Sequence, residues 1–255
     1  MKKLIKYVII DIVRNKIVLG YTLFLLVIAL SVFNLEDNTS KGLLSLLNIV
    51  LIIVPLLSII FSTIYVYNAA EFIELLVSQP VKRTTLLTSI YAGLTASLML
   101  AVVVGIGIPV VLYDRSAVGY TLVLVAVLLT AIFCGLALLA SVLTRDKAKG
   151  IGLSILLWFY FAVIFDGLIL FILFQFADYP LERVSIGLTA LNPIDLARIM
   201  VLLKMDISAM MGYTGAVFKT FFEGMSGVIF IATVLLLWMA TPIVMAVKKF
   251  DKKDL

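Results

Sequence analysis

Residues 117–144 read AVGYTLVLVAVLLTAIFCGLALLASVLT, an apolar run with no charged side chain. A membrane-spanning α-helix needs about 20 mostly apolar residues, because at a rise of about 1.5 Å per residue that length crosses a hydrocarbon core about 30 Å thick. This run therefore predicts a helix that crosses a lipid bilayer.

Five further runs have the same character, and they cover residues 17–33, 43–67, 86–113, 151–177 and 225–247. Together the six predict an all-α integral membrane protein with a single transmembrane domain over residues 1–255. Asp166, near the middle of the fifth run, is the one formal charge within the six. Because an ionisable side chain is costly at that depth, Asp166 is interpreted either as a functional group or as a hydrogen-bond partner of a neighbouring helix.

The composition excludes a water-soluble fold. Hydrophobic residues make up 64% of the chain and charged residues 14%, against roughly 25% charged residues in an ordinary soluble domain. The chain has no histidine and one cysteine, Cys134, which excludes a disulfide within the chain and the usual Cys and His metal sites. We therefore expect no metal site.

The lysine and arginine residues predict the orientation, because the cytoplasmic flanks of spanning helices retain positive charge. Most of them lie in four segments: Lys2, Lys3, Lys6, Arg14 and Lys16; Lys82 and Arg83; Arg145, Lys147 and Lys149; and Lys248, Lys249, Lys252 and Lys253. Both termini are therefore expected in the cytoplasm of a bacterium, with the chain in its inner membrane. The first run has no small-residue cleavage site, so we expect it to stay as a helix.

Two segments outside the runs have the pattern of short amphipathic helices. Residues 1–16 predict a helix on the inner leaflet, with an apolar face formed by Leu4, Ile5, Val8, Ile9, Ile12 and Val13. Residues 68–83 read NAAEFIELLVSQPVKR and predict a short helix that Pro80 ends. Its polar stripe comprises Glu71, Glu74 and Ser78. Such a helix offers a partner protein an apolar face and an acidic edge. The alternative is a connector that only caps the two spans.

The connection at residues 178–224 is too apolar for a solvated loop. It predicts a helix that starts with Asn192 as N-cap and Pro193 as its first residue, packed against the outer ends of the spans. Three methionines lie here, Met205, Met210 and Met211. Thioethers suit Cu(I), but methionine is also a common filler of apolar surfaces, and without Cys or His partners the second role is favoured.

The residues for an enzyme are missing. Without histidine, zinc-type intramembrane proteolysis and haem ligation by imidazole are excluded, and Asp166 alone cannot form an aspartyl dyad within one chain. No Gly-Lys dipeptide occurs, so the chain has no P-loop. Any ATP-driven step must come from a separate ATPase chain with its own ATP and Mg²⁺, and no cofactor is expected here.

Three short segments resemble a known family. Residues 71–83, EFIELLVSQPVKR, resemble the acidic, Leu-Leu, Pro, basic signature in the first cytoplasmic loop of ABC-2 type permeases, the six-helix membrane subunits of ABC exporters. Residues 191–199, LNPIDLARI, and 211–218, MGYTGAVF, are similar to the NosY permeases of the nitrous oxide reductase maturation transporter. The resemblance implies the ABC-2 fold of type V exporters.

The resemblance also implies partners. NosY-like subunits pair with a second copy of themselves, bind two copies of a NosF-type ATPase, and meet a periplasmic β-helical NosD-type protein. The implied role is to support assembly of the copper-sulfur centre of nitrous oxide reductase, by moving a sulfur or copper-related species or by passing ATPase-driven motion to the periplasmic partner. A copper chaperone and nitrous oxide reductase itself would be linked indirectly. Membrane lipids surround the chain, and no nucleic acid is expected.

The resemblance implies roles for three groups of residues. The coupling helix that seats on the ATPase would comprise residues 68–83, with Glu71, Phe72, Glu74, Leu75, Ser78, Gln79, Pro80, Lys82 and Arg83 at the contact. A second cytoplasmic contact would comprise Arg145, Lys147 and Lys149, which otherwise are plain topology signals. The surface for the periplasmic partner would comprise Asn192, Pro193, Asp195, Arg198, Gly212, Tyr213 and Gly215.

Two alternative functions stay open at this point. One is an ABC-2 permease for another cargo, such as a lipid, a drug or a motility-linked component. The other is a membrane scaffold that docks partners and transports nothing. A co-purifying ATPase favours a permease, and a β-helical periplasmic partner favours the NosY-like one.

Overall fold

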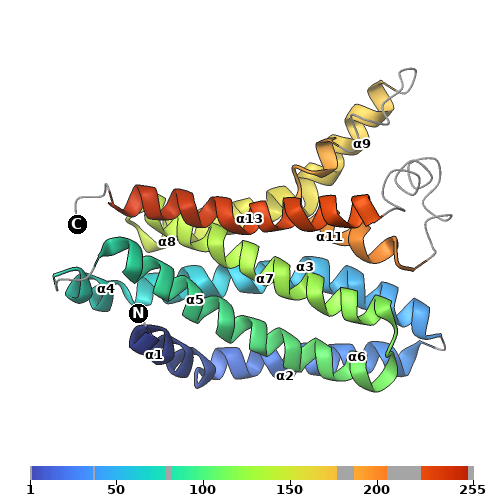
Figure 1. Ribbon diagram of the computed structural model, residues 1–255, viewed down its shortest axis with the longest axis horizontal. Coiled ribbons are helices and arrows are strands. Elements are labelled where there is room, and N and C mark those ends of the chain that lie inside the picture. Colours follow the sequence, from blue (N-terminus) through green and yellow to red (C-terminus); the bar gives the residue numbers. More distant parts are fainter. Residues whose placement is uncertain (1, 37, 79–81, 177–186, 206–224, 252–255) are drawn as a thin grey trace.

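The computed structural model describes residues 2–36, 38–78, 82–176, 187–205 and 225–251, and within these ranges the secondary structure is helical, without a β-strand. Figure 1 shows long, roughly aligned helices packed side by side. Six helices are long and apolar enough to cross a membrane. The prediction of an all-α, multi-pass membrane protein is confirmed at this level.

The six candidate spans are each built from one to three helical segments. The uninterrupted ones are α2 (Lys16–Leu35), α3 (Thr39–Asn68), α7 (Ala117–Leu143) and α13 (Met225–Asp251). The third span joins α5 (Arg83–Val102), η1 (Val103–Gly107) and α6 (Ile108–Tyr113), and the fifth joins α8 (Lys147–Phe159), η2 (Tyr160–Ile164) and α9 (Phe165–Gln175). The shorter helices include α1 (Lys2–Val13), α4 (Ala70–Val77) and α11 (Pro193–Leu202).

Side-chain caps fix where several helices begin. A helix start leaves backbone N–H groups without partners, and a short polar side chain can accept from them. Five helices begin after such a residue: Asn15, Asn38, Ser116, Asp146 and Asn192. The start of α11, with Asn192 as N-cap and Pro193 in the first turn, is as the sequence predicted.

α7 is the central helix of the bundle. It packs against α3, α5, α8, α11 and α13, and its side chains from Leu129 to Leu138 are all buried. A small residue permits one of these approaches, because a Cβ added at Gly135 would lie 3.4 Å from Ile243 and 3.5 Å from Pro242 of α13. Small residues let helix backbones approach closely in lipid, where apolar burial alone does not drive association.

α1 packs on α5 through Val8 and Ile12, both fully buried. A Cβ at Gly93 of α5 would lie 2.5 Å from Val8 Cγ1, so a glycine is needed at this crossing. Val13, which the sequence placed on the same apolar face, is 40% exposed. Val13 is exposed because α5 covers only part of the apolar face of α1.

The fifth span bends at η2, a π-helical turn. Figure 1 shows α9 leaving the bundle beyond this turn. Its large apolar side chains are consequently exposed, with Leu170, Phe171 and Phe174 at 68%, 66% and 86%. π-Helical turns inside α-helices are a recognised cause of sharp bends.

The two ends of the bundle differ in what they carry. In Figure 1, α1, α4, the start of α8 and the last turns of α13 lie at one end, and α6 and α11 lie at the other. The basic residues near the start of α5, the start of α8 and the end of α13 therefore gather at the α4 end.

Candidate functional site

α4 is a two-turn helix that directly continues the second span. Only Ala69 separates it from α3, and Ile73 points into the bundle with 7% of its surface exposed. Glu71, Phe72 and Leu75 are exposed. The helix closes where the Ser78 hydroxyl donates to the Leu75 carbonyl at 2.8 Å. The outer face of α4 is therefore both acidic and apolar.

The turn between α7 and α8 is tied to the end of α3. The Tyr67 hydroxyl donates to the Thr144 carbonyl at 3.2 Å and also hydrogen-bonds to the Thr144 hydroxyl. Lys147 Nζ donates to Asn68 Oδ1 at 2.8 Å. Asp146 caps α8 by accepting from the Lys149 amide at 2.8 Å. The turn that carries the predicted second contact is thus linked to the residues from which α4 starts.

Gly150 allows this linkage. It lies in the first turn of α8, is buried, and faces the ring of Tyr67. A Cβ added at Gly150 would overlap the Tyr67 ring and hydroxyl. Sequence reasoning did not find either residue, because nothing local to Tyr67 indicates a glycine 83 positions later.

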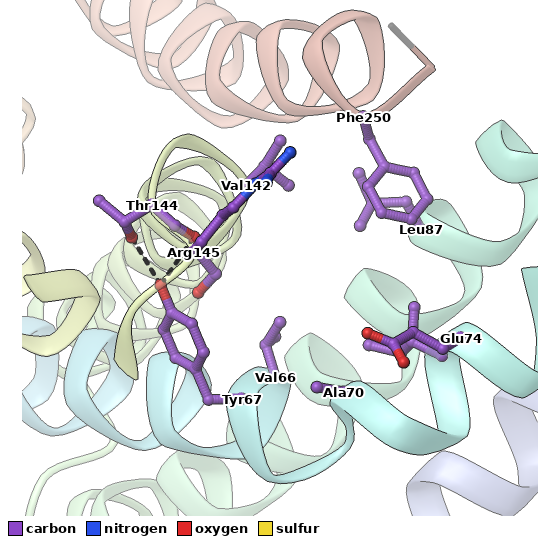
Figure 2. A pocket seen from close by; sticks show the side chains of 11 residues that line it. Val66, Tyr67, Ala70, Glu74, Leu87, Val142, Thr144, Arg145 and Phe250 are labelled. Atoms are coloured by element: carbon purple, nitrogen blue, oxygen red, sulfur yellow. Dashed lines mark hydrogen bonds between the residues drawn. The ribbon is translucent and has the colours of Figure 1, made fainter. Parts of the chain in front are cut away.

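A cavity of about 330 Å³ lies behind α4, between α3, α5, α7 and α13. Figure 2 shows the Glu74 carboxylate pointing into this space and Arg145 on the opposite wall. The remaining lining is mostly apolar: Val66, Tyr67, Ala70, Ile73, Leu87, Ser141, Val142, Thr144 and Phe250. The structure therefore brings Glu74 and Arg145, assigned from the sequence to two separate contacts, to the walls of one cavity.

A second cavity, of about 270 Å³, lies on the α1 side of α4. Here the Tyr65 hydroxyl donates to Asp11 Oδ2 at 3.1 Å, and the rings of Tyr7 and Phe72 lie 5.6 Å apart. Asn15 also lines this cavity. These contacts attach α1 to both α3 and α4, so α4 has a hollow on each side. The sequence signal that could have indicated this cavity is the presence of aromatic residues close to the end of the second apolar run, since aromatic side chains are enriched at membrane interfaces.

The other predicted contact residues near α4 have different placements. Lys82 is exposed and Arg83, the first residue of α5, is partly buried. Gln79 and Pro80 lie outside the described residues. Gly212, Tyr213 and Gly215, together with Met210 and Met211, also lie outside them.

At the opposite end, the predicted partner-facing residues of α11 mostly point into the bundle. Asn192 is fully buried, Pro193 is buried, and Asp195 is 6% exposed. The side chain of Arg198 is 34% exposed. Three of these four residues are thus buried in the bundle, whereas the resemblance implied that they lie on the surface for a partner.

The Asp166 side chain forms an ion pair with this helix. Arg198 Nη1 donates to Asp166 Oδ2 at 3.1 Å and to Asp195 Oδ1 at 3.2 Å. Asn192 Nδ2 donates to Asp195 Oδ2 and to the Phe161 carbonyl, both at 2.9 Å. Asp166 thus has a partner on a neighbouring helix, the second of the two interpretations that its position in the fifth run allowed.

The pKa of Asp195 is raised to about 7, chiefly by burial and also by the nearby Asp166 carboxylate. The Arg198 guanidinium and the Asn192 amide act against this shift. The causes have the expected signs, since both desolvation and a like charge disfavour the ionised carboxylate.

Together, the helical architecture and the six long apolar helices define the class of this protein as an all-α membrane protein with several spans. No protein-family model matches the chain, and no curated protein matches it.

Proposed function

We propose that this chain is the membrane subunit of an ATP-driven transporter of the ABC-2 type. A separate ATPase chain would dock on the end of the bundle formed by α4, the turn between α7 and α8, and the first turn of α8. The observation that carries the proposal is the linkage between α4 and this turn. Tyr67 and Asn68, the last residues of α3, hold the turn through Thr144 and Lys147.

This linkage supports a mechanical role for α4. α4 continues α3 after one residue, and residues 144–146 join α7 to α8. A displacement of α4 is therefore transmitted to the second, fourth and fifth spans at once.

The surface of α4 has the chemistry of a docking site. Leu75 is 66% exposed and Phe72 36% exposed, beside the carboxylates of Glu71 and Glu74. A few well-packed central side chains carry most of the binding free energy of a protein interface, while surrounding charges set the orientation and the association rate. A basic groove with an apolar floor is the complementary surface that we infer for the ATPase.

The more specific proposal, a NosY-type role in nitrous oxide reductase maturation, rests on the resemblance of residues 191–199 and 211–218. Its partners would be two NosF-type ATPases, a second copy of this chain and a NosD-type periplasmic protein, in a bacterial inner membrane with both termini in the cytoplasm. The α4 geometry serves a permease for any cargo. Identification of the proteins that co-purify with the chain in mild detergent separates these possibilities.

The docking proposal is tested by Leu75→Glu, which places a charge in the centre of the α4 surface. The readout is the amount of P-loop ATPase that co-purifies from native membranes and its ATP hydrolysis rate in the complex. We expect Leu75→Glu to remove at least nine-tenths of the bound ATPase, since a buried unpaired charge costs a few kcal/mol and about 1.4 kcal/mol is tenfold in affinity.

Leu35→Glu is the matched control, because Leu35 is a comparably exposed leucine, at 82%, in the last turn of α2. It lies at the end of the bundle away from α4 (Figure 1). Equal ATPase recovery with Leu75→Glu and Leu35→Glu would contradict the docking site. Complexes that never contain a P-loop ATPase would contradict the transporter class.

A further inference from the structure

Two carboxylates share one guanidinium nitrogen where α11 meets the fifth span. Asp166 lies in the first turn of α9, and Asp195 and Arg198 lie one helical turn apart on α11. Both carboxylates accept from the same atom, Arg198 Nη1, at 3.1 Å and 3.2 Å. Only 9% of the Asp195 side chain is exposed, so this group is largely removed from water.

The charges in this cluster do not balance. When all three groups are ionised, two negative charges face one positive charge, and Asn192 adds a neutral donor. Elsewhere on the helical elements packed against α11, the titratable groups are Lys41, Tyr65 and Tyr67 of α3, Tyr120 and Cys134 of α7, Tyr160 of η2, and Lys248, Lys249 and Asp251 of α13. None of these acts on Asp195, whose electrostatic partners are Asp166, Arg198 and Asn192. A buried charge without compensation is strongly unfavourable.

The cluster spans the bend of the fifth span. Asn192 Nδ2 donates to the carbonyl of Phe161, inside the π-helical turn η2, at 2.9 Å. Arg198 holds Asp166 just beyond the same turn. The α11 segment is therefore hydrogen-bonded to the fifth span before and after the point where α9 leaves the bundle (Figure 1).

We propose that Asp195 holds a proton beside the Asp166 carboxylate, and that this proton holds α11 against the bend of the fifth span. With Asp195 neutral, one carboxylate charge faces the guanidinium of Arg198, so the bound proton makes the cluster neutral. Loss of the proton places a second negative charge on the largely buried Asp195 and weakens the docking of α11.

A proton fits this site better than a metal ion. Magnesium and calcium need about six or more oxygen ligands, and sodium, also a hard cation, would need a similar oxygen cage. Four oxygen atoms of the cluster already accept hydrogen bonds: Asn192 Oδ1 from the Ile194 amide, Asp195 Oδ2 from Asn192, and Asp195 Oδ1 and Asp166 Oδ2 from Arg198. A metal would have to displace the guanidinium.

The direction of the pH dependence follows from the raised pKa of Asp195. The docked state binds the proton with a pKa of about 7, and the undocked state with the ordinary aspartate value of about 4. The stabilisation is therefore complete below about pH 4, is lost as pH rises to about 7, and stays constant above that value. Across this window, the ratio of undocked to docked α11 rises about tenfold per pH unit.

The experiment is hydrogen exchange of the full chain in lipid nanodiscs between about pH 5 and pH 9, with rates corrected for intrinsic exchange. We expect the protection of α11 amides to fall about tenfold per pH unit up to about pH 7 and then to level. Asp195→Asn, a neutral isostere, is expected to abolish this slope. Asp251→Asn, an exposed acid at the end of α13, is the control and is expected to retain it.

A slope that persists in Asp195→Asn would overturn the proposal, as would protection that responds to sodium at fixed pH. Infrared spectroscopy on the unmodified chain tests the proton directly, even where a variant does not fold. We expect a protonated carboxylic acid band that disappears as pH rises through about 7. Absence of that band at about pH 5 would also overturn the proposal.

Discussion

Replacing Gly150 by alanine tests the link between the end of α3 and the start of α8. The added Cβ overlaps the Tyr67 ring, so the ring must move and its hydroxyl loses Thr144. Inserting a methyl group into a packed contact costs about 1–3 kcal/mol and losing the hydrogen bond about 0.5–1.5 kcal/mol. Alanine regains about 1 kcal/mol through its helix propensity. We expect a net loss of about 1–3 kcal/mol in unfolding free energy.

The matched control lies on the same helix. Gly152 is two residues further along α8, and a Cβ there would meet nothing within 4 Å. Gly152→Ala should therefore leave stability unchanged or raise it by up to about 1 kcal/mol. The assay is equilibrium unfolding in mixed micelles, following tryptophan fluorescence.

A double variant separates the overlap from other effects. With Tyr67→Ala in place, Gly150→Ala no longer meets the ring, so its additional cost should vanish and the two changes should be coupled by about 1–3 kcal/mol. If Gly150→Ala were as stable as Gly152→Ala, the close packing of α8 on Tyr67 would be refuted.

Three further predictions concern other contacts. Gly93→Ala should detach α1 from α5, measured as increased proteolysis near the N-terminus, and Val8→Ala should restore the contact only in part, because it removes Val8 Cγ1 but leaves Val8 Cβ 2.7 Å from the new Cβ. Asn192→Ala should lower the unfolding free energy by about 2–4 kcal/mol, because it removes the N-cap of α11 and leaves the buried Phe161 carbonyl without its donor. A loss below about 0.5 kcal/mol would contradict the role of Asn192 in holding α11. Lys147→Ala should change stability by less than about 1 kcal/mol, because its bond to Asn68 is exposed to solvent, and a larger loss would mean that this bond is shielded.

Asp166 and Asp195 show which contacts the local sequence can predict and which it cannot. Asp166 is visible as a charge in an apolar run, and the run predicts that it needs a partner. The partner, Arg198, is 32 residues away and lies on a helix that the sequence placed at the outer surface. Asp195 was expected to face a partner protein, and its burial beside a second carboxylate depends on how α11 docks.

The sequence by itself determined the spans and the start of one helix. Six apolar runs predict six long helices because backbone groups in hydrocarbon must be paired within the helix. Asn192 followed by Pro193 predicts a helix start because the Asn side chain accepts from a nearby amide and proline has no N–H that needs a partner. Tertiary structure alone decided which faces meet: Gly150 against Tyr67, Glu74 across from Arg145, and α9 bent away at η2. The physical reason is that lipid and protein interior are equally apolar, so hydrophobicity does not mark the packed face of a spanning helix, and small residues and buried polar pairs choose it instead.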